Sequence, residues 1–284
     1  PIARVSAKIS VGMRLDEIMI ANTPASFEPA LDYVVTKMPR FPFDKFSSAN
    51  NKLSTQMKAT GEVMSVGRTI EESLLKAARS LEIGVNHLYM KKFENFSDDE
   101  MLNYIKDGTD DRIYAIAELL RRKTDIGMIC NATKIDMLFL EKIKNIVKTE
   151  NKLKEHIGDT DTLYAAKKLG FSDEFIGKLW GMTGEEIYKI REKRGMFPVY
   201  KMIDTCASEF ESYIPYFYST YEDENESVVS DKKKIIVLGS GPIRIGQGVE
   251  FDYSTVHAVT TLKKSGYEAI IINNNPETVS TDYT

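Results

Sequence analysis

The sequence predicts a multi-domain chain of the α and α/β classes with a mostly helical centre. The 284 residues are enough for more than one domain. From about residue 83 apolar side chains recur with the period of a helix, whereas the end of the chain has the pattern strand, glycine-rich loop, helix, strand. The predicted division is therefore 1–82, 83–230 with an acidic linker at 222–230, and 231–284.

The composition is that of an ordinary globular protein, with 42% hydrophobic and 28% charged residues. A formal net charge of −4 gives no electrostatic reason to expect nucleic acid or an anionic membrane as a partner. Cys130 and Cys206 are too far apart to suggest a metal knuckle or a disulfide framework, which favours a reducing compartment. No run reaches the roughly 18 apolar residues of a membrane span. We therefore expect a cytoplasmic protein.

The N-terminal part mixes strand and helix signals. Residues 33–38 are rich in β-branched side chains and are followed by Pro39, which predicts a strand that ends there. Residues 61–67 lead from a short strand into a helix, for which Thr69 is the expected N-cap and Glu72 its partner three residues later. The predicted buried stripe of that helix is Leu74, Leu75, Ala78 and Leu81.

Capping signatures recur at short intervals in the middle of the chain. Ser97, Thr109 and Thr133 each have a polar residue three positions later, so each predicts the start of a helix. Apolar residues then repeat at helical spacing after each of them. Further helices are predicted at about 161–169, 173–180 and 184–194.

The C-terminal stretch carries the candidate site. Residues 235–238 form an apolar strand, followed by a glycine-rich turn, a helix from about 254 to 264 closed by Gly266, and a second strand at 269–272. Glycines let backbone amides approach an anion closely, and those in this turn are Gly239, Gly241 and Gly246. Polar residues lie just beyond two adjacent strands, where open α/β sheets bind ligands: Arg244, Gln247, Glu250 and Glu277.

A dinucleotide-binding loop fits this turn poorly. That fingerprint needs a third glycine where Arg244 stands, and an acidic residue for the ribose where residues 273–275 are asparagines. An anion- or substrate-facing loop is favoured, and a purely structural turn stays open.

Two other patterns favour structural roles. Residues 171–195 have the outline of a DNA-reading helix-turn-helix, whose second helix carries Lys189, Arg191, Lys193 and Arg194. Neighbouring glutamates neutralise much of this charge, so two core helices are the better interpretation. The histidines have no spacing typical of a metal site: His87, His156 and His257.

Longer stretches of the sequence resemble a known family. The stretch VLGSGPIRIGQGVEFDYSTVHA is followed by INNNPETVSTDY. Together they resemble the opening of the second synthetase half of the carbamoyl-phosphate synthase large subunit. The end of the first half is similar to TPASFEPALDYVVTKMPRFPFDKF and QMKATGEVMSVGRTIEESLLKA. Its helical oligomerisation domain resembles DRIYAIAELL, IDMLFLEKI and KLWGMTGEEIYKIREK, so the resemblance covers essentially the whole chain.

The resemblance implies an ATP-dependent carbon–nitrogen ligase that makes carbamoyl phosphate from bicarbonate, ammonia and two ATP for pyrimidine and arginine synthesis. A glutaminase small subunit supplies the ammonia from glutamine, and the cofactors are ATP, Mg²⁺ (or Mn²⁺) and K⁺. Residues 1–82 would end the first, carboxyphosphate-forming ATP-grasp half, and 83–230 would be the helical linking and oligomerisation domain. Residues 231–284 would begin the second half with a truncated, Rossmann-like pre-ATP-grasp domain.

The resemblance also gives the glycine-rich loop a role. In the family, four matching positions lie at the exit end of a tunnel that carries carbamate between the halves, and polar groups there would guide a short-lived anion. Gln247 matches a further motif position, whereas Ile243 departs from the asparagine often found there, which puts one minor contact in doubt. The four positions are Arg244, Gly248, Glu250 and Glu277, and with Gln247 they make up the predicted tunnel-facing set.

Catalytic residues and metal ligands are expected outside this sequence. On the resemblance, the metal-binding groups of the first ATP-grasp module would precede Pro1, and the nucleotide-binding arginines of the second would follow Thr284. We therefore expect an internal fragment that is inactive alone, binds no ATP or metal productively and associates with other large subunits. The alternative is a self-standing helical association module without catalysis, suggested by the helical middle and the aromatic-rich stretch at 197–221.

Overall fold

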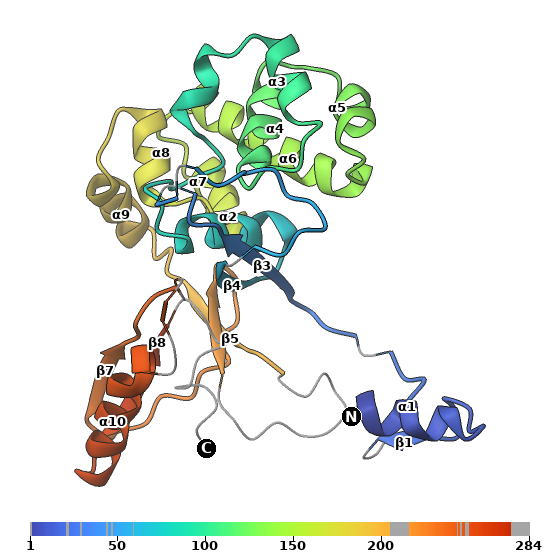
Figure 1. The fold of residues 1–284 in the computed structure, drawn as a ribbon. Helices are drawn as coiled ribbons and strands as arrows, with labels where there is room; N and C mark the ends of the chain where they lie inside the picture. The colour runs from blue at the N-terminus through green and yellow to red at the C-terminus, as the bar shows by residue number, and fades with distance from the viewer. Residues whose placement is uncertain are drawn as a thin grey trace.

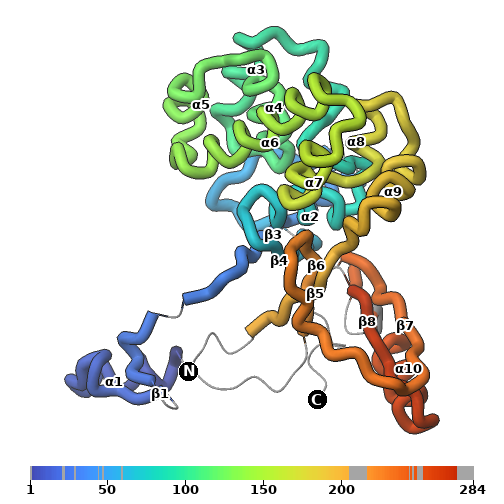
Figure 2. The backbone as a smooth tube through the Cα atoms, turned by 180° about the vertical axis from the view of Figure 1, so that it is seen from behind, coloured from blue at the N-terminus to red at the C-terminus, as the bar shows by residue number. Residues whose placement is uncertain are grey.

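The fold is given by a computed structural model, in which a helical region is joined to smaller strand-containing parts (Figures 1 and 2). α1 (Ile2–Ser10) and the short strands β1 (Met19–Ile20) and β2 (Thr23–Pro24) stand apart from the helical region in both views. The structure describes residues 2–20, 23–28, 30–43, 45–46, 48–58, 60–204, 216–242, 244, 246–247 and 250–273, the last range without the side chains of its first two residues.

The N-terminal strands form a support for the first core helix. β3 (Val34–Arg40) pairs antiparallel with β4 (Gly61–Gly67), and α2 (Ile70–Ser80) packs on both strands. The expected end of the first strand at Pro39 is wrong, because Pro39 lies within β3 opposite Glu62. A strand that is paired on one side tolerates a proline whose missing N–H faces away from its partner.

The predicted cap and buried stripe of α2 are confirmed. The Thr69 hydroxyl accepts a hydrogen bond from the Glu72 amide at 3.1 Å, which satisfies one of the free donors at the start of the helix. Leu75 and Ala78 are fully buried. Both belong to the same apolar cluster as Phe93, so the core is continuous across the expected division between residues 82 and 83. The domain boundaries themselves stay predictions.

The helical region is organised around α6 (Met137–Glu155), which packs against α2, α4, α5, α7 and α8. Its apolar face places Leu140, Ile143 and Ile146 in the core, as the 3.6-residue period predicts. The surrounding elements are η1 (Lys91–Asn95), α3 (Asp98–Tyr104), α4 (Arg112–Arg121), α5 (Ile126–Thr133), α7 (Thr160–Lys168), α8 (Asp173–Trp180) and α9 (Gly184–Lys193).

The capping predictions for these helices have mixed outcomes. Ser97 forms the expected capping box with Glu100 at the start of α3. Thr109 does not begin α4, because its hydroxyl donates to Asp111 at 2.9 Å and the helix starts after Asp111. Thr133 ends α5 instead of starting α6. The Asp136 carboxylate caps α6, accepting from the Leu138 amide at 2.8 Å.

A second antiparallel pair follows the helices, made of β5 (Val199–Met202) and β6 (Phe217–Thr220). Its end is anchored on the helical region, since the Thr220 hydroxyl donates to the buried Glu72 carboxylate at 3.0 Å. The ring of the next residue, Tyr221, makes cation–π contacts with two side chains. Lys167 Nζ is 5.1 Å from the ring centre and Arg191 Cζ is 5.5 Å from it. Burial raises the pKa of Tyr221 to about 12.

The C-terminal unit has the predicted β–α–β order. β7 (Lys234–Leu238) and β8 (Glu268–Ile272) are parallel, with Ile236 opposite Ile270, and α10 (Glu250–Lys264) packs on both strands. Gly266 takes the left-handed conformation, with φ +84°, that ends the helical segment. α10 starts earlier than the sequence indicates. The observed fold confirms the predicted class, a mixed α and α/β chain with a helical centre.

In the part of the chain that the structure describes, no helix combines the length and the apolar character that crossing a bilayer requires.

Candidate functional site

The glycine-rich turn begins at the carboxyl end of β7, next to the carboxyl end of the parallel strand β8. The Gly239 amide donates to the Ile272 carbonyl at 2.7 Å, and a Cβ atom on Gly239 would lie 2.6 Å from the side chain of Asn273. Only glycine fits this close approach. Gly241 and Gly246 have φ values of +83° and +85°, a conformation that side chains disfavour. The loop glycines are therefore required by the local backbone.

Two members of the predicted polar set come together in this turn. The Gln247 side chain accepts a hydrogen bond through Oε1 from the backbone amide of Arg244 at 2.8 Å. The Arg244 guanidinium points to the helical region, where Nη2 lies 2.5 Å from Oε2 of Glu82. Their side chains are 48% and 47% exposed, so this ion pair stabilises the fold by only about 0–1 kcal/mol.

Glu82 was not a sequence candidate. It follows Leu81, the C-cap of α2, and takes the left-handed conformation, with φ +52°, which is unfavourable by about 1–2 kcal/mol for a residue other than glycine. Arg40 on β3 holds this segment, because its Nη1 donates to the carbonyls of Leu81 at 2.9 Å and Glu82 at 3.2 Å. No sequence signal marks Glu82, since its partners lie far away along the chain.

The remaining predicted site residues are beyond this description. Gly248 and Glu277 lie outside the described residues, and Glu250 is placed as the first residue of α10 without its side chain. The structure therefore joins Arg244 and Gln247, and the complete set of tunnel-facing residues stays a prediction.

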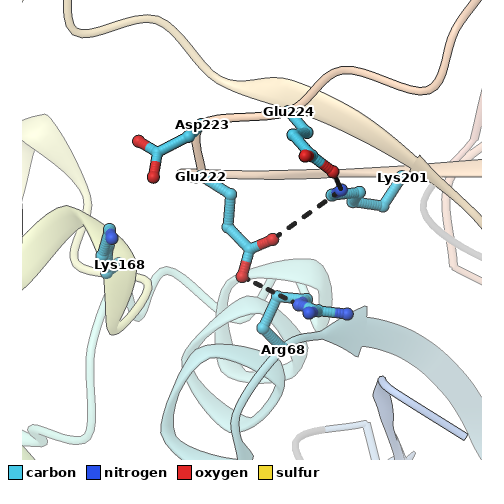
Figure 3. A pocket seen from close by; sticks show the side chains of 6 residues that line it. All are labelled: Arg68, Lys168, Lys201, Glu222, Asp223 and Glu224. Atoms are coloured by element: carbon cyan, nitrogen blue, oxygen red, sulfur yellow. Dashed lines mark hydrogen bonds and ion pairs between the residues drawn. The ribbon is translucent and has the colours of Figure 1, made fainter.

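A shallow polar pocket of about 300 Å³ lies between the linker and the helical region (Figure 3). Four of its six charged side chains pair with one another: Arg68 Nε lies 2.8 Å from Glu222 Oε1, and Lys201 Nζ lies 3.7 Å from Glu224 Oε2. Paired acids and bases that face water leave little net charge for a ligand. The pocket is best explained as the contact that holds the linker.

A buried charge network lies inside the helical region. Arg121 donates from Nε and Nη2 to the two oxygens of Glu150, both at 2.8 Å, and His87 Nε2 lies 2.9 Å from Oε1. Burial alone would raise the pKa of Glu150, but hydrogen bonds from Arg121 and His87 lower it to about 2. Burial lowers the pKa of His87, so the neutral ring donates to Glu150 and stacks on Phe175.

The helix-turn-helix outline corresponds to α8 and α9, which pack as core helices. Arg191 is buried and binds Asp173 through Nε at 3.0 Å, while Lys189 pairs with Glu185 on the same helix. These contacts pair two of the four basic residues on which the nucleic-acid interpretation depends. Within the described residues, no group of three or more His, Cys, Asp or Glu side chains could hold a metal ion.

Two family models match the chain. Residues 62–195 match the model described as carbamoyl-phosphate synthetase large chain, oligomerisation domain. Residues 231–284 match the carbamoyl phosphate synthase preATP-grasp domain. The first match runs from β4 through α9, and the second contains β7, the glycine-rich loop, α10 and β8.

Proposed function

Because the chain belongs to the carbamoyl-phosphate synthase large-chain family, we propose that it provides assembly and linkage in that ligase. The larger match is to an oligomerisation domain, and the smaller one is to a domain that carries the glycine-rich loop. The partner is another large chain, and the contact is made by the helical region.

One observation supports this role: exposed apolar side chains occur on α5 and in the first turn of α6. Met128, Met137, Leu138 and Phe139 are 51%, 39%, 55% and 52% exposed. α5 lies at the outer edge of the helical region, on the opposite side from α9 (Figures 1 and 2). Exposed apolar groups of this kind are typical of protein–protein contacts.

A second copy of the chain is the occupant that fits this surface. Most soluble homo-oligomers are closed by twofold contacts, in which the same surface of each copy faces the other. Self-association would therefore remove the same apolar side chains from water on both copies. We name Met128, Met137, Leu138 and Phe139 the α5–α6 surface.

Sedimentation velocity over a range of concentrations tests the assembly role. The chain should form a species larger than a monomer, and the double variant Leu138→Glu/Phe139→Glu should shift it to the monomer. Val228→Glu is the matched control, because Val228 is 92% exposed in the linker and the change adds the same kind of charge. A chain that stays monomeric at high concentration overturns the proposal.

The substrates, the source of ammonia and the pathways of the complete enzyme belong to the same proposal. The enzyme would take bicarbonate, two ATP and ammonia, which a glutaminase small subunit releases from glutamine, and it would serve pyrimidine and arginine synthesis in the cytoplasm. The family relationship supports this, together with the cationic Arg244 in a loop suited to an anion. The cofactors of that enzyme, ATP, Mg²⁺ (or Mn²⁺) and K⁺, belong to the same proposal.

An activity assay tests whether the chain serves linkage without catalysing the reaction itself. The purified chain, supplied with ATP, bicarbonate, ammonia, Mg²⁺ and K⁺, should form no carbamoyl phosphate. Product formation above a heat-inactivated sample would show that the chain carries catalysis itself, and would overturn the linking role.

A further inference from the structure

We propose that Glu82 is a positioning residue that docks the glycine-rich loop onto the end of α2 and orients Arg244. The two residues are separated by 162 positions in the sequence and come from the two different family matches. Their contact links the helical region to the C-terminal unit at the loop that carries the predicted site.

The Glu82 carboxylate fits against the loop as well as against one side chain. Its Oε2 lies 2.5 Å from Arg244 Nη2, and its Oε1 would lie 3.4 Å from a Cβ atom on Gly241. Arg244 is held at its other end too, because Gln247 accepts from its backbone amide. Both the backbone and the guanidinium of Arg244 therefore have defined partners.

The backbone of Glu82 is held by hydrogen bonds from β3. Arg40 on β3 donates to the carbonyls of Leu81 and Glu82, and Leu81 is buried in the contact with β4. These bonds hold the left-handed backbone of Glu82, which directs its side chain to the loop. A carboxylate anchored in this way can set the direction of a flexible arginine with little effect on the core.

The consequence for chemistry rests on the proposed function. A guanidinium has five N–H donors, more than the Glu82 contact uses, so Arg244 can hold Glu82 and still face a carbamate anion. The carboxylate also offsets part of the positive charge. A passing anion would then be guided by Arg244 without being retained.

Hydrogen–deuterium exchange of the 284-residue chain tests the docking. Glu82→Gln and Arg244→Gln should each speed exchange of the loop amides at 239–247 by roughly two- to five-fold, the size that such an exposed pair allows. The swap Glu82→Arg/Arg244→Glu should restore slow exchange. Glu185→Gln, which breaks the exposed Glu185–Lys189 pair on α9, should leave the loop unchanged.

Unchanged loop exchange in both single variants overturns the docking. Failure of the charge swap to restore protection overturns the pairing of these two residues as its cause.

A second measurement separates the docking from the proposed function. In the complete carbamoyl-phosphate synthase, Glu82→Gln should raise the ATP hydrolysed per carbamoyl phosphate formed, because misdirected carbamate is lost, and Glu185→Gln should not. An unchanged ratio together with faster loop exchange would overturn the carbamate role of Arg244 and support the docking alone.

Discussion

Charged side chains are held in opposite ways in the helical region and at the C-terminal β–α–β unit. Glu150 is buried and receives hydrogen bonds from Arg121 and His87, whereas Glu82 and Arg244 form one contact that is half exposed. A buried charge must be fully paired, so it fixes the packing around it. An exposed pair contributes little stability and can set only a direction.

Apolar side chains show the same difference. Leu119, Leu140 and Ile187 are fully buried among the helices, whereas Ile236 and Leu238 on β7 are 57% and 75% exposed. Burial of apolar area is the main source of folding free energy. We therefore expect the helical region to be the stable part of the chain and the β–α–β unit to unfold more easily.

The largest loss of stability is expected from Glu150→Ala. The change removes the buried carboxylate that Arg121 and His87 share and leaves Arg121 with the longer Glu118 ion pair, which should lower the free energy of unfolding by about 3–5 kcal/mol. Urea unfolding followed by the fluorescence of Trp180, the single tryptophan, measures it. Glu185→Ala on the surface of α9 is the control and should change stability by less than about 0.5 kcal/mol. A similar small loss for both variants would contradict a buried network.

Two neighbouring residues on α6 allow the stability contributions of a core and a surface position to be compared. Leu140→Ala should lower the free energy of unfolding by about 2–5 kcal/mol, because it leaves a cavity in the core. Phe139→Ala removes a larger, half-exposed side chain and should change the same quantity by less than about 1 kcal/mol in the monomer. Equal losses in urea unfolding would show that the two faces of α6 are not distinguished by burial.

Acid should weaken the helical region through the same network. His87 and Glu150 both have lowered pKa values in the folded state, so the unfolded chain binds more protons and stability falls as the pH falls. The loss begins below the ordinary His value of 6.5. The Glu150 part, about 3 kcal/mol, is lost between pH 4.5 and about 2.

Urea unfolding at a series of pH values measures this loss. The variant Glu150→Gln should lose the steep part below pH 4.5, because no carboxylate is left at this position. A wild-type stability that is constant from pH 7 to pH 3 would contradict the assignment.

The smallest change in the free energy of unfolding is expected from a substitution in the glycine-rich loop. Arg244→Gln should lower the free energy of unfolding measured through Trp180 by no more than about 1 kcal/mol, because the Glu82 contact is half exposed. A loss of several kcal/mol would mean that the loop is part of the core.

Local signals in the sequence predicted much of this fold. Thr69 and Ser97 cap their helices as expected, because capping depends on residues three positions apart. The same rule failed at Thr133, where Asp136 is the cap and Lys134, with φ +59°, ends the preceding helix. That helix, α5, was missed because a lysine in the left-handed conformation is not a typical stop signal.

Long-range pairs could not be predicted in the same way. His87 approaches Glu150 from 63 residues away, and Glu82 approaches Arg244 from 162 residues away. Neither pair has a local sequence pattern, and only the tertiary fold brings the two residues of each pair together. The glycine turn was predictable because its backbone demands are local, whereas the partner of its arginine was not.

Native-state hydrogen exchange at increasing urea concentration would compare the two regions in one measurement. We expect the amides of α4 and α6 to exchange only through global unfolding, and those of β7 and β8 to exchange at lower urea through a separate opening. The two sets of amides should therefore give different unfolding free energies. A single curve shared by both would contradict a stable helical region with a weakly attached β–α–β unit.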